Sequence, residues 1–269
     1  MPEKIIFVII LFIFLIAADD SSHSIQSGNK TEVFIIGTVH ENTDAFNSDT
    51  LLNILNEIKP DMILVECDSS YMTRDFQLKE DVKYAFLETY AITEYLKVRS
   101  AVLRPYDISD RDGFLDNIIR KQTESDFFYD IVSMYGTGKF NTESSNIYER
   151  YYSMIKLFAE DMTFSTASYI NSPAGSSNID TINYYTYEGL RQLIDITPEL
   201  EKYKPYWKRE CSYWENRNKS MIKNILGVIE YYEGKRIVVL CGFAHKNLLI
   251  NGISKSMNNK IVLKDFWNN

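Results

Sequence analysis

The chain has 269 residues, of which 45% are hydrophobic and 25% charged, and a formal net charge of −8 at pH 7. This length suffices for one domain with a sizeable core. The acidic balance argues against a nucleic-acid partner, because such binders normally carry a basic surface. Three cysteines cannot all pair, so no disulfide framework is implied.

The first 20 residues are predicted to be a signal peptide or a signal anchor. Lys4 precedes an apolar run over residues 5–18, which ends at Asp19 and Asp20. This run is short for a membrane span and suits the core of a signal peptide. We therefore expect an exported body, periplasmic or extracellular, that contacts a membrane only through this segment. Residues 21–31 are polar and are predicted to form a disordered leader.

Two segments, one near each end of the body, share the same pattern of an apolar strand, a glycine and a histidine. Residues 32–37 run apolar into Gly37, and His40 follows three positions later. Residues 236–242 repeat this up to Gly242, and His245 follows at the same offset. Continuous apolar runs of this length are typical of buried parallel strands. Glycine at the end of each run would allow a sharp turn and a close approach to a ligand.

Strands and helices alternate at both ends of the chain, with a helical block between them. This predicts an α/β fold with a mostly parallel central sheet flanked by helices and a large helical insertion, in a single domain over residues 32–269. A run rich in Ser, Asn and Gly over residues 171–178 predicts a loop, and the lysines of residues 202–208 predict a solvated loop. The remaining expected elements are helices 47–59, 78–98 and 213–233, strands 62–66, 101–107 and 260–265, and an insertion over residues 109–208 with helices near 113–134, 145–171 and 185–194.

Four side chains that suit catalysis follow the predicted strands: His40, Glu66, Asp107 and His245. The carboxyl ends of parallel strands lie at one edge of a sheet, where ligands bind. Two histidines and a carboxylate are a common ligand set for a catalytic divalent metal with a bound water. We expect His40, Glu66 and His245 to converge within about 8 Å, close enough to share one ion.

Each of these residues also has a purely structural interpretation. A histidine after a strand is often a turn residue, Glu66 could form a salt bridge or cap a strand end, and Asp107 is slightly favoured as a helix cap. Arg217, on a predicted helix, could be solvated or could direct its guanidinium at a carboxylate or an oxyanion. The cluster Tyr184, Tyr185 and Tyr187 is more typical of core and rim than of ligand contacts.

Four short motifs, taken in order, resemble the TraB/TIKI superfamily, which is related to erythromycin esterase and to the ChaN haem-binding proteins. They are Gly37 to His40, residues 60–66 ending in Glu66, the pair Arg217 and Asn218, and Gly242 to His245. The hallmark of that family is two Gly-x-x-His motifs, a strand-end Glu and an Arg-Asn helix. The resemblance covers residues 33–66 and 215–245 but not the insertion. One departure is the pair Lys246 and Asn247, which replaces small residues and is expected to alter the pocket rim.

TIKI proteins are described as proteases that depend on a divalent metal. The resemblance therefore implies that His40, Glu66 and His245 bind manganese, cobalt or zinc and act in catalysis, with Arg217 in support. Glu66 would be either a ligand or a general base. The expected function is an exported metal-dependent hydrolase, peptidase-like, with a peptide or small-molecule substrate.

Two alternatives stay open. One is a haem- or small-ligand-binding protein that resembles ChaN, for which the many tyrosines of the insertion would suit a pocket. The other is a metal-independent esterase that resembles erythromycin esterase, in which a histidine acts as general base on water. Turnover that resists a chelator would favour the second, and a Soret band on mixing with haem would favour the first.

Overall fold

A computed structural model describes residues 30–109, 111–256 and 259–266. At its centre lies a five-stranded, all-parallel sheet with the order β3-β2-β4-β1-β5. The predicted α/β fold with a helical insertion is confirmed. The strands are β1 (Thr31–Thr38), β2 (Met62–Val65), β3 (Val102–Pro105), β4 (Arg236–Gly242) and β5 (Ile261–Lys264).

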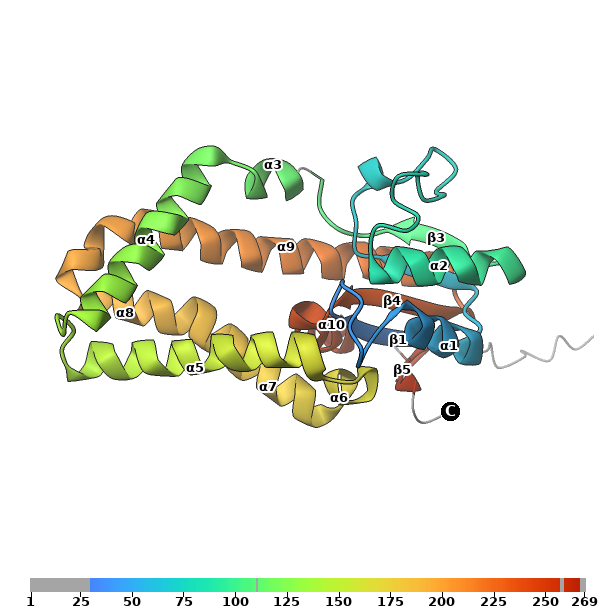
Figure 1. The fold of residues 1–269 in the computed structure, drawn as a ribbon. Helices are drawn as coiled ribbons and strands as arrows, with labels where there is room; N and C mark the ends of the chain where they lie inside the picture. Colours follow the sequence, from blue (N-terminus) through green and yellow to red (C-terminus); the bar gives the residue numbers. More distant parts are fainter. Residues whose placement is uncertain (1–29, 110, 257–258, 267–269) are drawn as a thin grey trace, which may run out of the picture.

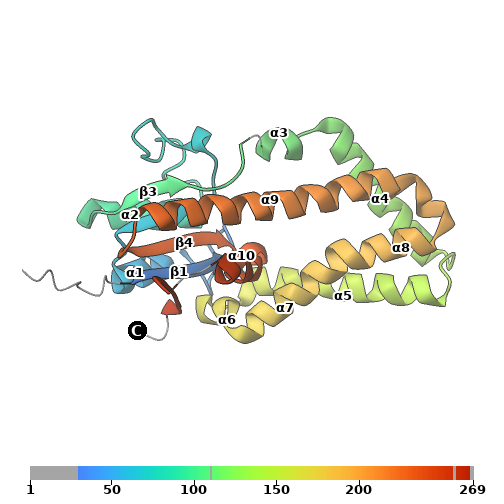
Figure 2. The same cartoon turned by 180° about the vertical axis from the view of Figure 1, so that it is seen from behind.

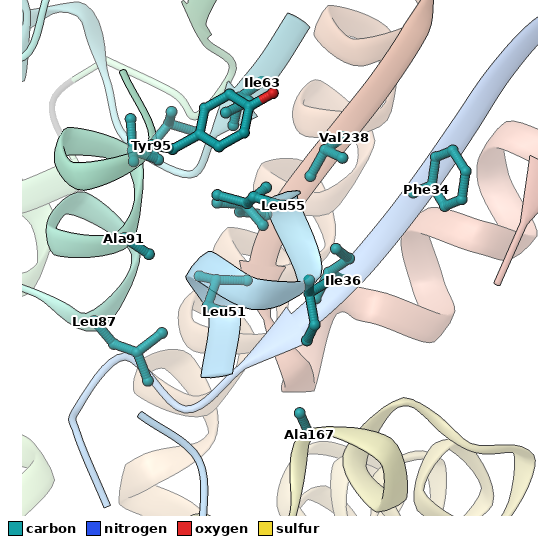
Figure 3. Packing of buried hydrophobic residues seen from close by; sticks show 14 of the residues in the cluster. Phe34, Ile36, Leu51, Leu55, Ile63, Leu87, Ala91, Tyr95, Ala167 and Val238 are labelled. Carbon is teal, nitrogen blue, oxygen red and sulfur yellow. The ribbon is translucent and has the colours of Figure 1, made fainter. Parts of the chain in front are cut away.

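The two faces of the sheet are covered by different helices, and alternate residues of each strand face them. On one face, Phe34 and Ile36 pack with Leu55 of helix α1 (Ser48–Ile58) and with Ala91 of helix α2 (Leu87–Val98), as Figure 3 shows. On the other face, Val33 and Ile35 pack with helices α9 (Lys204–Tyr231) and α10 (Phe243–Ser256). Strands buried on both faces read as continuous apolar runs, which is why the sequence predicts them well.

The insertion is helical and extends away from the sheet on the side where α10 lies (Figures 1 and 2). It has its own apolar cluster, which includes Phe127, Leu193 and Trp207. Long α9 runs from that cluster back along the sheet and so joins the two parts. The helices of the insertion before α9 are α3 (Arg111–Leu115), α4 (Ile118–Gly136), α5 (Thr142–Phe164), α6 (Ala167–Asn171), α7 (Pro173–Asn183), a π-helix (Tyr184–Gly189), α8 (Leu190–Ile196) and a 3-10 helix (Pro198–Tyr203).

Several boundaries differ from the sequence-based expectation. The helix expected over residues 78–98 begins only at Leu87. Phe86 is its N-cap and is extended, and the backbone N–H of Phe86 donates to the Thr89 hydroxyl. The loop expected over residues 171–178 is largely α7, since Ser172 caps its amino end and Pro173 occupies the first turn. The content of Ser, Asn and Gly in residues 171–178 suggested a loop and gave no sign of this helix.

Two further expectations were wrong in detail. Residues 202–208 are helical rather than a solvated loop, and Trp207 within them is 5% exposed. Thr31, expected at the end of the disordered leader, instead pairs with Ile261 in the sheet, and residues 21–29 of that leader lie outside the described residues. The signal segment, residues 1–20, lies outside the described residues. Among the described residues, none of the helices is both long and apolar enough to cross a membrane.

Candidate active site

The predicted site residues do meet at the carboxyl edge of the sheet. His40 follows β1, Glu66 follows β2, and Asp107 follows β3. His245 lies in the first turn of α10, directly after β4, and Arg217 lies on α9, which crosses behind this edge. Segments far apart in the sequence are therefore brought to one rim by the parallel arrangement of the strands.

His40 is held by a buried glutamate that the sequence analysis did not single out. Its Nδ1 lies 2.7 Å from Oε1 of Glu88, in the first turn of α2, and the Thr38 hydroxyl donates to the same carboxylate. His40 has a φ of 65°, a left-handed conformation that is rare for histidine and is often found at functional sites. Because a carboxylate accepts the Nδ1 proton, the lone pair of neutral His40 is on Nε2, which Glu88 does not engage.

The surroundings of His40 favour its charged form. Burial lowers the pKa of the imidazole, but the hydrogen bond and charge of Glu88, together with the charge of Glu66, outweigh burial and raise the pKa above 6.5. Glu88 stays ionised, because His40 and the Thr38 hydroxyl offset the cost of burying its carboxylate and lower its pKa. A proton taken up by His40 would therefore be stabilised by two nearby carboxylates.

Glycine at position 242 is required by the place of the His40 ring. A Cβ at Gly242 would lie 2.6 Å from His40 Nε2, a distance that no real contact tolerates. The backbone N–H of Gly242 in turn donates to Oε2 of Glu66 at 2.6 Å. The sequence analysis expected this glycine to allow a ligand to come close to the backbone, but the group that comes close is the imidazole of His40. This contact places the imidazole beside the Glu66 carboxylate.

Arg217 is the central cation of the rim, and all its nitrogens are engaged. Its Nε and Nη2 donate to the two oxygens of Asp107 at 3.0 and 2.8 Å, and Nη2 also donates to Oε1 of Glu66 at 2.6 Å. Asp107, whose side chain is fully buried, therefore binds Arg217 rather than capping the next helix. Burial disfavours the charge of Arg217, but the two acids more than compensate and raise its pKa. The arginine holds Glu66 in place, and four of its five N–H groups are used by Asp107, Glu66 and His245.

His245 lies behind this group and is neutral. Its Nε2 is 2.9 Å from Nη1 of Arg217, which can only donate, so Nε2 must be the acceptor. Nδ1 therefore carries the proton and donates to Oδ1 of Asn218 at 2.7 Å. The ring stacks on Trp214 with centroids 4.4 Å apart. Burial is the main reason that the pKa of His245 falls to about 4.

This neutral histidine should make the fold sensitive to acid. Its pKa is about 4 in the folded protein, against an ordinary value near 6.5, so the unfolded chain binds more protons between these values and stability falls as pH drops through this window. Between pH 6.5 and 5, proton uptake by His245 in the unfolded chain removes on the order of 2 kcal/mol of the free energy of unfolding. Urea unfolding at both pH values should show that His245→Gln loses less stability than the wild type. An equal loss in both proteins would contradict the assignment.

A cavity of about 350 Å³ opens in front of these groups. Its charged or titratable lining residues include His40, Glu66 and Glu88, and also Arg111 and Asp112 of α3. Its remaining wall is mostly apolar and is formed by Val65, Cys67, Tyr71, Val82, Phe86, Thr89 and Leu240. An apolar pocket with a few convergent polar groups is the usual form of a small-molecule site. His245, Arg217 and Lys246 are not part of its lining, so the expected effect of Lys246 on the rim is not seen.

A cysteine nucleophile does not fit this pocket. Cys67 lines it, but burial and the negative charges of Asp68, Asp107 and Glu66 raise the pKa of its thiol to about 12. The reactive form of cysteine is the thiolate, which would be scarce at neutral pH. Cys67 therefore acts as a small apolar wall residue, as expected for a buried cysteine.

The expected metal ligands His40, Glu66 and His245 share one rim but are not arranged as a metal site. Oε1 of Glu66 is 3.6 Å from Nε2 of His245, yet the guanidinium of Arg217 occupies the lone pair of that histidine. Both oxygens of Glu66 already accept hydrogen bonds from Arg217 and Gly242. Over the described ranges, no three His, Cys, Asp or Glu side chains are placed to hold one ion. A permanent cation at the centre of the ligand set is a poor partner for a divalent metal.

Sequence reasoning thus found five members of the site, His40, Glu66, Asp107, Arg217 and His245, and missed two. Glu88 was detectable in principle, because it lies on the apolar stripe of its helix with Ala91 and Tyr95, where an acid is costly without a partner. Arg111 follows no strand and offered no such signal. Comparisons with protein-family models, with characterised proteins and with solved structures gave no match, so the geometry alone supports the site.

Proposed function

We propose that this protein is a hydrolase of a carboxylic ester or amide, in which His40 activates water as a general base without a metal ion. The observation that carries the proposal is the pair His40 and Glu88. One imidazole nitrogen is held by a buried carboxylate, and the ring lines an apolar cavity. This is the arrangement of a base and its orienting acid in many hydrolases.

The reaction follows from these positions. Nε2 of His40 accepts a proton from water as the water oxygen bonds to the carbonyl carbon of the substrate. Glu88 stabilises the resulting imidazolium and keeps its ring in place, and Glu66 adds a second nearby negative charge. When the tetrahedral intermediate collapses, the bond from carbon to the leaving oxygen or nitrogen breaks, and His40 returns the proton to that atom. The products are a carboxylic acid and an alcohol or amine.

Arg217, His245 and Asn218 support this chemistry from behind. Arg217 fixes both Glu66 and Asp107, and neutral His245 accepts from it without adding a second positive charge. Asn218 binds the Nδ1 proton of His245, and its own amide N–H donates to the carbonyl oxygen of Trp214. These residues are positioning residues, since the cavity is not lined by them.

A chelator distinguishes this proposal from the metal-dependent peptidase. With an activated ester such as 4-nitrophenyl butyrate, turnover by the purified protein should persist after prolonged treatment with EDTA and should not rise when manganese, cobalt or zinc is added. Loss of turnover in EDTA with recovery on adding one of these metals would support the metal-dependent alternative. Absence of turnover together with a Soret band on mixing with haem would support the haem-binding alternative.

The pH dependence of turnover tests the His40–Glu88 pair. The base must be neutral to act, so kcat/KM should rise with pH and level off above a pKa that lies higher than 6.5. Glu88→Gln removes the main influence that opposes the effect of burial on the pKa of His40, so this limb should move to lower pH. Glu94→Gln, which changes a partly exposed glutamate that pairs with Lys97 on the same helix, should leave the limb in place. An unshifted limb in Glu88→Gln would count against the pair.

We further propose that the body acts outside the cytoplasm on a peptide or another small substrate. The apolar run at residues 5–18 supports export, and the size of the cavity supports a substrate of modest volume. Fusing residues 1–29 to a reporter that is active only after export would test the first point. A cytoplasmic reporter would contradict it.

A further inference from the structure

We propose that the cavity is built for a substrate that carries a carboxylate group, and that Arg111 binds this group. The inference rests on the proposed hydrolase only for its turnover arm, because binding of the carboxylate does not depend on catalysis. Arg111 opens α3 and lines the cavity together with His40 and Glu66. It is the positive charge that the insertion contributes to the lining, beside the negative charge of Asp112.

Among the charged side chains that line the cavity, Arg111 stands out because its hydrogen bonds are unmet. Glu66 accepts from Arg217 and from Gly242, and Glu88 binds His40. Asp112 accepts from the hydroxyl of Tyr71 at 2.7 Å. In contrast, Nε of Arg111 is buried and has no hydrogen-bond partner within the part of the chain that the structure describes.

The nearest acid does not satisfy Arg111. Oδ2 of Asp107 lies 4.0 Å from Nη1 of Arg111, which is beyond hydrogen-bond distance. The Asp107 carboxylate is already used, since it accepts two bonds from Arg217 and one from the backbone of Ile108. A buried N–H without an acceptor costs free energy, and the structure offers no partner for it in the described residues. Nε itself has almost no accessible surface, but a third of the Arg111 side chain is exposed, so a ligand in the cavity would meet the terminal Nη groups.

The geometry of the group indicates the class of ligand. A guanidinium presents parallel N–H donors as a planar fork, which matches the two oxygens of a carboxylate. A residue that stabilises a transient oxyanion must be held in advance by other contacts. Arg111 lacks such contacts, because its one ion pair spans 4.0 Å and a third of its side chain is exposed. It is therefore better suited to binding a carboxylate already present on the substrate.

The substrate would then lie across the cavity. Its carbonyl group would be placed near Nε2 of His40, the apolar wall would cover its middle, and its carboxylate would face Arg111. Acidic groups close to the pocket, Glu66, Glu88 and Asp112, would repel an anion that approached any other part of the rim. Arg111 thereby fixes the direction in which an acidic substrate enters, and a neutral substrate would gain nothing from it.

A pair of probes that differ only in charge tests the binding step. 4-Acetylbenzoate, a ketone that cannot be hydrolysed, should bind the wild-type protein about 10- to 100-fold more tightly than 4-nitroacetophenone, its neutral and equally non-hydrolysable isostere, as measured by calorimetry. Arg111→Gln should abolish this preference. Arg74→Gln, which removes an exposed arginine away from the cavity lining, should retain it. Equal affinity for the two probes, or none for either, would overturn the proposal, as would a preference that survives in Arg111→Gln.

The matched esters test turnover separately. 4-Acetoxybenzoate should be hydrolysed with a lower KM than methyl 4-acetoxybenzoate, and Arg111→Gln should raise the first KM about 10- to 100-fold while changing kcat little. A loss confined to kcat would assign Arg111 to the oxyanion instead and would overturn the carboxylate role. If 4-acetylbenzoate binds through Arg111 but neither ester is hydrolysed, the hydrolase proposal fails while the carboxylate site stands.

Discussion

His40→Asn is expected to lower kcat/KM for an ester substrate by about 10²- to 10⁴-fold, the usual contribution of a general base. Asparagine is the appropriate replacement because it tolerates the left-handed backbone that His40 adopts, with a φ of 65°. The variant therefore removes the imidazole without adding backbone strain. Alanine at this position would combine the two effects and blur the result.

This loss of turnover should not be explained by unfolding of the variant. The His40 side chain is 45% exposed, so the packing that it contributes is limited. The variant does leave the buried Glu88 carboxylate without its imidazole partner. Asn218→Ala, which removes the hydrogen-bond partner of His245 behind the rim, offers a comparison. A His40→Asn protein that is still folded at the assay temperature, with turnover nearly abolished, would show that the imidazole acts in catalysis. Activity within about threefold of the wild type would contradict the proposed mechanism.

Arg217→Met should cause the largest loss of stability of any single change at the site, about 3–5 kcal/mol. The arginine neutralises Glu66 and Asp107, whose side chains are 5% and 0% exposed. Without it, two carboxylates would be buried side by side with no partner, or would have to take up protons. Arginine and methionine are close in size, so the loss of stability in Arg217→Met would come from the lost charge rather than from a cavity.

An exposed arginine provides the matched control for this prediction. Arg191 also pairs with two acids, Glu188 and Asp195, but its side chain is 52% exposed. Arg191→Met should therefore cost no more than about 1 kcal/mol. If Arg217→Met does not fold, the combined change with Glu66→Gln and Asp107→Asn should recover folded protein, because it removes the unpaired charges. Equal costs for Arg217→Met and Arg191→Met in urea unfolding would disprove the account of the rim.

The sheet was predictable because its strands follow simple rules. Phe34 and Ile36 face one layer of helices, and Val33 and Ile35 face the other, so the run is apolar throughout. Parallel strands then place His40 and Glu66 at one edge without further information. The start of α2 was not predictable from periodicity, since the apolar pattern continues before Phe86 and only the cap at Phe86 and Thr89 ends it.

The partners of the site residues were harder to predict, because they depend on tertiary packing. His40 and Glu88 are 48 positions apart, and only the placement of α2 against the sheet brings them together. Arg217 was expected to face a substrate, yet α9 directs it inward to Asp107, 110 positions away. The sequence pattern of His40 and His245 therefore predicted a metal site. In the structure, the partner of His40 is the carboxylate of Glu88 and that of His245 is the guanidinium of Arg217.

Chemical rescue of His40→Asn is the most direct test of the account. The cavity of about 350 Å³ beside Glu88 has room for a free imidazole in place of the missing ring. Adding imidazole to His40→Asn should restore part of its ester turnover in a saturable manner, and the same addition should leave the wild type and EDTA-treated wild type unchanged. A His40→Asn protein that hydrolyses the ester as fast as the wild type, with no response to imidazole, would show that His40 is not the base.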